Sequence, residues 1–366
     1  MTAPLLSARQ LNRATLARQL LLERSRLDPV TAIEHLVGLQ SQTPQTWYTG
    51  LWSRLAEFDP AAFGARLQNR DVVRIAVMRS TIHLVSSRDA LFLRPLVQSM
   101  TERGARTAYG KHWQGLDLDA VAEAARSLLD EAPLTFAELG AVLGQHWPDR
   151  DAAALAQLAR TRLALVQIPP RGVWGRSGSA RHATVESWLG RALDESPSIE
   201  TMVVRYLGAF GPATVRDVQA WCGLTRLNEV IERLRPGLVV FRDEEGAELF
   251  DLPEAPRPDG DATTPVRFLY DYDNLLRSHE NRSRMTGYDT SVLGTTKNGI
   301  PPNFVLIDGT VRAAWILSRE KDNATLGIRL LGSVSAPQRD ELAMEAADFV
   351  AFAAAGAAAV DIRIAE

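Results

Sequence analysis

A repeated succession of helical and β-rich segments constrains the fold of this chain more than any other feature of its sequence. In the first copy, helices are predicted over residues 7–23, 28–40 and 47–57, and β-rich runs follow at 72–78 and 81–86. The second of these helices opens with an Asp-Pro pair, a cap followed by proline at the first helical position. Helices followed by a two-stranded ribbon are typical of a winged helix-turn-helix.

The same succession returns twice. Thr135 and Glu138 have the spacing of a capping box and predict a helix to residue 147. A second helix over 151–162 and short strands at 164–168 and 173–174 complete this copy. In the third copy Thr214 and Asp217 form a related cap, and Gly223 ends the helix. That copy continues with a helix over 227–234 and strands at 239–241 and 248–250.

The last third of the chain has a different pattern, a linker followed mainly by β-rich segments. Residues 253–265 are rich in Pro, Asp and Gly and read as a linker. Beyond it we predict a small barrel or curled sheet with one helix, in which Asp308-Gly309 forms a hairpin turn. Its expected elements are strands at 266–270, 304–307, 311–317, 325–331 and 360–364, and a helix over 338–355.

We therefore expect an α+β fold of three tandem winged helix-turn-helix domains followed by a C-terminal β-barrel. The expected boundaries are 1–110, 111–195, 196–258 and 259–366. The 366 residues fit several domains on the usual size of about 100–200 residues each.

Composition excludes several kinds of chemistry. The single cysteine, Cys222, rules out an internal disulfide framework and a cysteine zinc cage, and the six histidines have no metal-ligand spacing. GxGxxG, GxxxxGK[ST] and GxSxG motifs are absent. No apolar run reaches the roughly 18 residues of a membrane span, and the N-terminus lacks signal-peptide features. We expect a cytoplasmic protein with no metal and no cofactor.

Charge is distributed unevenly along the chain. Residues 1–110 carry 14 Arg and no Lys against 8 Asp and Glu, whereas the whole chain has a net charge of −3. A basic first third points to phosphate contacts. A solvated surface in an arginine-rich proteome is the alternative explanation.

Two glutamines stand at the end of the second predicted helix. Val30, Ile33 and Val37 form an apolar stripe that Gln40 continues at the next helical position, and Gln42 follows two residues later. Buried amides need partners for both their oxygen and their nitrogen. Gln40 and Gln42 are either functional groups or local partners of helix-end carbonyls and a neighbouring loop.

An ordered set of motifs resembles the AlkZ/YcaQ-type winged-helix DNA glycosylases. The resemblance begins with Leu39-Gln-Ser-Gln42 and Trp47-Tyr-Thr-Gly-Leu-Trp-Ser-Arg54, and it spans almost the whole chain. The Gln-x-Gln form matches the azinomycin-resistance branch rather than the Gln-x-Asp branch. The later segments that carry the resemblance are Met78-Arg-Ser-Thr-Ile-His-Leu-Val85, Tyr272-Asp-Asn-Leu-Leu-Arg-Ser-His-Glu-Asn-Arg-Ser-Arg284 and Val305-Leu-Ile-Asp-Gly309.

The resemblance implies three winged helices and a β-barrel around a DNA channel. It further implies excision of N7-alkylated purines, unhooking of interstrand crosslinks, self-resistance to a genotoxin, and catalytic roles for Gln40 and Gln42. The expected partner is double-stranded DNA bearing such lesions, and a monomer without membrane association is expected.

The residue types also suit cleavage of the bond between an alkylated purine and its sugar. An N7-alkylated purine carries a positive charge and departs without a strong general acid, while cationic character develops on the sugar. A glutamine carbonyl can accept a hydrogen bond from water and present its negative dipole end to the sugar. We therefore predict that Gln40 and Gln42 jointly hold the water and support the oxocarbenium-like state.

Several other side chains are candidates for DNA contact. Arg79, Thr81 and His83 alternate along a predicted strand and would share one face. A second polar cluster and a hairpin tip supply the remaining candidates, which are His279, Arg282, Arg284 and Lys297. Trp47, Tyr48 and Trp52 could stack on a base, but aromatic residues at helical spacing are more often core.

The main alternative is a non-catalytic transcriptional regulator with winged helices. A regulator would read base edges at a preferred operator, whereas a glycosylase would bind phosphates and respond to damage. A protein-interaction scaffold, the third alternative, predicts no salt-dependent affinity for DNA.

Overall fold

The protein was examined as a computed structural model that describes residues 3–286 and 300–365. Its N-terminal part contains α1 (Ala8–Arg18), α2 (Pro29–His35), α3 (Trp47–Arg54) and α4 (Pro60–Gln68). Ser7 caps α1 through a capping box, and Asp28 caps α2 with Pro29 at the first position. The predicted helices of this region are thus present, but they end earlier than expected.

The early end of the second helix, α2, matters most for the position of Gln40. This helix ends at His35 rather than extending to Gln40, because Val37 and Gly38 adopt positive φ angles of 54° and 90°. A Cβ on Gly38 would lie 2.7 Å from Val85, so this close approach requires glycine. Gln40 consequently lies on a short strand, β1 (Leu39–Gln40), and not on a helix.

The first sheet joins strands from two of the predicted units. Its five strands run in the order β1-β3-β2-β4-β5, with antiparallel neighbours. The fifth strand corrects the prediction at 173–174, because the segment that pairs with β4 is His182–Thr184. The other strands of this sheet are β2 (Val72–Ala76), β3 (Ile82–Ser86) and β4 (Leu165–Gln167), and the last is β5 (His182–Thr184).

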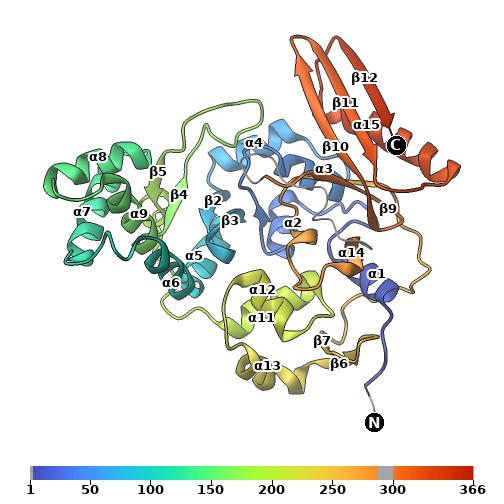
Figure 1. Ribbon diagram of the computed structural model, residues 1–366, viewed down its shortest axis with the longest axis horizontal. Helices are drawn as coiled ribbons and strands as arrows, with labels where there is room; N and C mark the ends of the chain where they lie inside the picture. The colour runs from blue at the N-terminus through green and yellow to red at the C-terminus, as the bar shows by residue number, and fades with distance from the viewer. Residues whose placement is uncertain (1–2, 287–299, 366) are drawn as a thin grey trace.

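Helices surround this sheet and connect its strands (Figure 1). Thr135 forms the predicted capping box of α8, and its helix ends one residue before Trp147. The helices between β3 and the region after β5 are α5 (Ser87–Leu96), α6 (Gln98–Tyr109), α7 (Leu118–Glu131), α8 (Phe136–His146), α9 (Ala152–Arg162) and α10 (Val185–Leu189).

The third helical group follows the prediction closely. Thr214 forms a capping box at α12, and Gly223 ends that helix in the left-handed conformation with φ of 82°. Two strands follow and pair with each other as a two-stranded ribbon, which single bridges join to Leu5 and Ala213. The elements are α11 (Ile199–Phe210), α12 (Val215–Cys222), α13 (Asn228–Leu234), β6 (Val239–Arg242) and β7 (Glu248–Asp251).

The C-terminal region is an open sheet covered by one long helix. Its strands run in the order β12-β11-β10-β9-β8, and β11 and β12 are parallel. Among the described residues β8 and β12 are the two edges, so the sheet is not the closed barrel that the sequence suggested. Its elements are β8 (Arg267–Leu269), α14 (Ser283–Thr286), β9 (Asn303–Ile307), β10 (Thr310–Glu320), β11 (Asn323–Leu330), α15 (Ala336–Ala353) and β12 (Ala359–Ala365).

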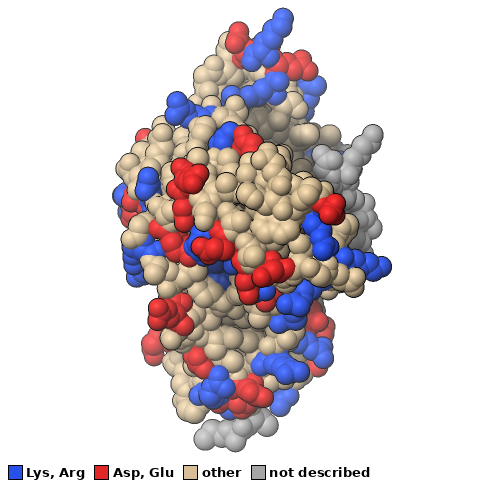
Figure 2. All heavy atoms as spheres, turned by 90° about the vertical axis from the view of Figure 1, so that its left-hand side faces the viewer, with Lys and Arg blue, Asp and Glu red and all other residues tan. Residues whose placement is uncertain are grey.

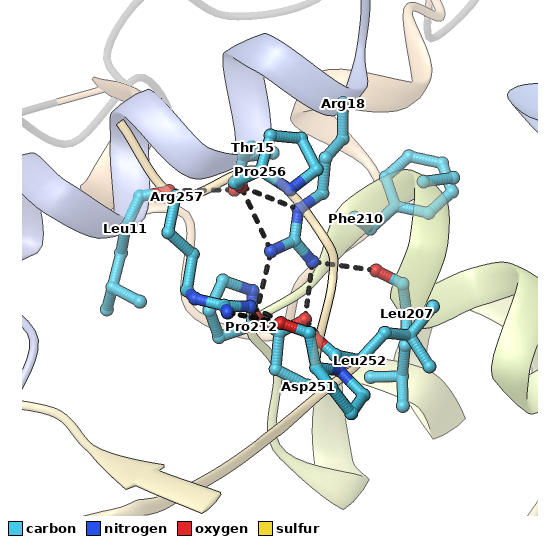
Figure 3. A network of polar contacts seen from close by, with 12 residues as sticks. Leu11, Thr15, Arg18, Leu207, Phe210, Pro212, Asp251, Leu252, Pro256 and Arg257 are labelled. Carbon is cyan, nitrogen blue, oxygen red and sulfur yellow. Dashed lines mark hydrogen bonds and ion pairs between the residues drawn. The ribbon is translucent and has the colours of Figure 1, made fainter. Parts of the chain in front are cut away.

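A buried ion pair connects the N-terminal helix to the third helical group (Figure 3). Arg18 of α1 donates to both carboxylate oxygens of Asp251 at 2.6 and 2.8 Å, and both side chains are fully buried. Arg18 also donates to the Leu207 carbonyl, and Arg257 donates to Asp251. The ends of α1, α11 and β7 are therefore held together at one point.

The face of the molecule that carries α7 and α8 presents side chains of both charges. Figure 2 shows acidic and basic side chains interspersed over this face. In the ranges that the structure describes, no helix is both long and apolar enough to cross a lipid bilayer.

Candidate functional site

The Gln40-Ser41-Gln42 segment runs along the edge of the first sheet. Gln40 is in register with His83 of β3, and Ser41 donates its backbone N–H to the Ile82 carbonyl at 2.7 Å. Beneath it, Arg74 donates to the Ser41 carbonyl at 2.7 Å. These bonds fix the backbone of the segment from the side of β2 and β3.

A residue far along the chain holds the segment from the other side. Asn274 accepts the Gln40 backbone N–H at 3.3 Å and donates to the Gly38 carbonyl at 2.7 Å. Both bonds are buried, and Asn274 is 1% exposed. The C-terminal region therefore contributes directly to the position of Gln40.

The two glutamine side chains differ in their surroundings. Gln40 is 4% exposed, and its Oε1 accepts a hydrogen bond from Nη2 of Arg79 at 2.8 Å. Gln42 is exposed, and its Oε1 accepts the backbone N–H of Ile82 at 3.3 Å. Gln40 is thus buried with a polar partner, whereas Gln42 can be reached from solvent.

Arg79 lies in the turn between β2 and β3 rather than on a strand. Its φ of 54° is left-handed, and its side chain also donates to the Trp221 carbonyl at the end of α12. Burial lowers the pKa of its guanidinium to about 10, with further contributions from the positive charges of Arg277 and Arg282. Arg79 remains a cation at neutral pH.

His83 and Thr81 do not share an exposed strand face with Arg79. Thr81 precedes β3 and donates its hydroxyl to the Met78 carbonyl. His83 is fully buried, and its Nδ1 lies 2.9 Å from the Thr81 carbonyl, so Nδ1 is the protonated nitrogen. Burial, aided by the charge of Arg79, lowers the pKa of His83 to about 3 and keeps the ring neutral.

Positive charges gather beside the motif. Arg277 and Arg282 lower the pKa of Arg79, and burial together with Arg282 lowers the pKa of Arg277. Arg277 lies over the ring of Tyr272 at 5.8 Å. In the described residues none of the three arginines of this arginine cluster (Arg79, Arg277 and Arg282) forms an ion pair with a carboxylate, and the charge of Asp271 offsets only part of the effect of burial and Arg282 on Arg277.

Two of the predicted DNA contacts have partners within the protein. His279 is 3% exposed, and its Nε2 lies 3.1 Å from the Phe210 carbonyl. Arg284 donates to the Pro212 carbonyl at 3.0 Å. The two side chains thus pack against the α11–α12 turn. Lys297 lies outside the described residues.

The aromatic side chains near the motif belong to the core. Trp47 and Tyr48 are fully buried and stack at 3.9 Å, and Tyr48 donates to the Gly172 carbonyl. Trp52 stacks on Phe352 at 5.5 Å. None of these three rings faces the Gln42 side chain as a free stacking surface.

Sequence reasoning missed Asn274 and Arg277 as parts of this site. Both fall within the segment that carries the family resemblance, in which the predicted contacts are His279, Arg282 and Arg284. Among the described residues, no group of three or more His, Cys, Asp or Glu side chains is arranged to hold a metal ion.

Comparisons with known proteins agree with this architecture. A family model described as DNA glycosylase AlkZ-like matches residues 33–352. Among solved structures, the DNA glycosylase AlkZ of Streptomyces sahachiroi is similar, with a TM-score of 0.78 and 21% sequence identity over 98% of this chain and 99% of that chain. At that identity the likeness establishes a shared fold. No curated protein matches the sequence.

Proposed function

We propose that this chain, which belongs to the AlkZ-like DNA glycosylase family, hydrolyses the N-glycosidic bond of N7-alkylated purines in duplex DNA. We propose that it acts as a monofunctional enzyme, cutting the bond to the base and leaving the DNA strand intact. The observation that carries this proposal is the exposed Gln42 amide beside Gln40 and an arginine cluster that forms no ion pair within the described residues.

The reaction needs little acid catalysis. The bond from the sugar carbon to the purine nitrogen breaks, and its electron pair neutralises the positive charge on the alkylated base. A water oxygen then bonds to the cationic sugar carbon, and the proton that water loses passes to solvent. Because an amide is a weak base, catalysis depends on orienting that water and on stabilising the developing charge.

The site offers suitable groups for both tasks. Gln42 has a carbonyl with one lone pair engaged by Ile82 and a second available for water. Neutral His83 adds no positive charge next to an oxocarbenium-like sugar. An undamaged guanine is a poor leaving group, and we expect the enzyme to leave it intact.

DNA binding is proposed at Arg277 and Arg282. Neither side chain forms an ion pair with a carboxylate among the described residues, so phosphate oxygens can serve as their partners. The three successions of helices and paired strands, α2–β3, α7–β5 and α11–β7, support the interpretation as tandem winged helices. The open C-terminal sheet would form part of the DNA channel.

We further propose that the enzyme unhooks interstrand crosslinks and protects its host from a genotoxin such as azinomycin. An accessible amide suits a lesion that joins both strands, because a crosslinked base cannot be turned fully into a deep pocket. We propose that it acts in the cytoplasm as a monomer, without a cofactor.

A base-release assay tests this function. A duplex with one 7-methylguanine is incubated with excess protein, and abasic sites are converted to breaks with alkali. Breaks at the lesion support a glycosylase. Absence of breaks, together with a footprint on one operator sequence, would favour a transcriptional regulator. A crosslinked duplex analysed on a denaturing gel tests unhooking separately.

A further inference from the structure

The orientation of the Gln40 amide is fixed by its partner. Arginine has only hydrogen-bond donors, so the Gln40 atom 2.8 Å from Nη2 of Arg79 must be the oxygen. Nε2 therefore points away from Arg79. Within the part of the chain that the structure describes, Nε2 donates to no protein group, although the Gln40 side chain is almost completely buried.

Arg79 is itself held in place on two sides. Its guanidinium also donates to the Trp221 carbonyl, and its backbone packs against the end of α12, where a Cβ on Gly223 would lie 3.3 Å from the Arg79 Cα. The backbone of Arg79 is left-handed, and its side chain reaches both the Trp221 carbonyl and the Gln40 amide. One guanidinium thus connects the last turn of α12 to the Gln-Ser-Gln segment.

We propose that Arg79 is a positioning residue that holds the Gln40 amide with its N–H groups directed toward the bound lesion. This inference rests on the proposed glycosylase function. The two glutamines then have different roles. The Gln40 carbonyl is bonded to the Arg79 cation, whereas the Gln42 carbonyl has a lone pair available for water. Gln40 then acts as a donor to the DNA substrate, and Gln42 acts as the acceptor.

Polarisation of the Gln40 amide by Arg79 supports the same assignment of roles to the two glutamines. A guanidinium bonded to the amide oxygen draws electron density from the amide, which weakens the oxygen as an acceptor and strengthens the N–H groups as donors. A donor suits the electron-rich groups of the lesion, above all the purine ring nitrogens that gain electron density as the base departs.

The competing role for Arg79 is a phosphate contact, and the two roles differ in what they change. A phosphate contact contributes to DNA affinity and to its salt dependence. A positioning residue acts on the chemical step through Gln40. The difference is measurable with Arg79→Ala, Arg79→Lys and Gln40→Ala, with the double variant of Arg79→Ala and Gln40→Ala, and with Arg282→Ala as the matched control.

The expected results are specific. Arg79→Ala lowers the single-turnover rate of 7-methylguanine release about 10- to 100-fold, the effect of a displaced catalytic group. Arg79→Lys retains an intermediate rate, because one ammonium cannot reproduce the fork that contacts two carbonyls. The double variant is no slower than Gln40→Ala, since Arg79 acts through that amide. Guanidinium ion partly restores Arg79→Ala and does not restore the double variant.

Binding supplies the complementary measurement. The Kd of Arg79→Ala for a duplex with a stable abasic-site analogue stays within about twofold of wild type, whereas Arg282→Ala weakens binding and lowers its salt dependence. Additive losses in the double variant, or weaker binding of Arg79→Ala with an unchanged rate, would overturn the proposal.

A further readout does not depend on activity. The side-chain amide signals of Gln40 in an ¹⁵N–¹H spectrum are assigned by their loss in Gln40→Ala. They should shift in Arg79→Ala and Arg79→Lys but not in Arg282→Ala. Unshifted signals would contradict the positioning role. A wild-type protein that releases no base would instead overturn the proposed function. The spectra would still show whether Arg79 contacts the Gln40 amide.

Discussion

Asn274 bonds to the backbone on both sides of Leu39, accepting the N–H of Gln40 and donating to the carbonyl of Gly38. The two segments lie 234 residues apart in the chain for the first of these contacts. The position of Gln40 therefore depends on the docking of the C-terminal region.

Replacing Asn274 should uncouple the two regions. Asn274→Ala leaves two buried backbone groups without partners, which costs about 1–3 kcal/mol for each unsatisfied group. We expect a lower urea midpoint and slower base release. Asn303→Ala, at a partly buried amide of the C-terminal sheet, is the control and should affect base release much less. Equal losses of activity in both variants would show that docking at Asn274 is not specific to the site.

Arg277 and Arg282 should contribute most to the salt dependence of DNA binding. Arg277→Ala and Arg282→Ala each remove one proposed phosphate contact, so the slope of log K against log salt should fall by about one for each. Fluorescence anisotropy with an undamaged duplex over a range of salt measures these slopes. Arg363→Ala, on the distant strand β12, should leave the slope unchanged, and an identical slope in all variants would remove the cluster from the interface.

Buried histidines should make the fold sensitive to acid. The folded pKa values of His83 and His182 are lowered to about 3 and about 4, mainly by burial, against about 6.5 in an unfolded chain. Between these values the unfolded state binds more protons, so the free energy of unfolding falls as pH decreases below about 6.5.

The contribution of each histidine is about 1.4 kcal/mol per pH unit where the unfolded form is fully protonated. His83→Asn keeps a donor near the Thr81 carbonyl and should reduce the slope of stability against pH by about one proton. Urea unfolding from pH 7 to 5 measures the slopes, and the same slope in His83→Asn and wild type would refute this explanation.

The Arg18–Asp251 pair should be essential for stability. Asp251→Ala leaves the buried Arg18 cation without its carboxylate, and breaking a buried pair typically costs about 3–5 kcal/mol. Asp361→Ala, which breaks the exposed pair with Arg363, should cost less than about 1 kcal/mol. Comparable urea midpoints for the two variants would contradict the role of this pair.

Local signals in the sequence predicted many elements correctly. The caps at Ser7, Thr135 and Thr214 all begin helices, and Gly223 ends one, because these residues act through bonds to the nearest turn. The Asp308-Gly309 turn also joins two paired strands as predicted. Such features need no information from distant parts of the chain.

The site was less predictable because its partners are distant. The stripe of Val30, Ile33 and Val37 indicates a longer helix, but packing of Gly38 against Val85 turns the backbone before Gln40. His279 stands among polar residues in the sequence, yet the α11–α12 turn buries it. In both cases tertiary packing overrides a local pattern.

We infer that two neutral amides suffice to release a base that already carries a positive charge. Single-turnover release of 7-methylguanine by Gln40→Ala and Gln42→Ala tests it most directly, with Gln114→Ala as a control at an exposed glutamine of another turn. We predict losses of about 10²-fold or more in each site variant, the lower range for a positioned proton acceptor, and wild-type rates in the control. Wild-type rates in both site variants would contradict the account.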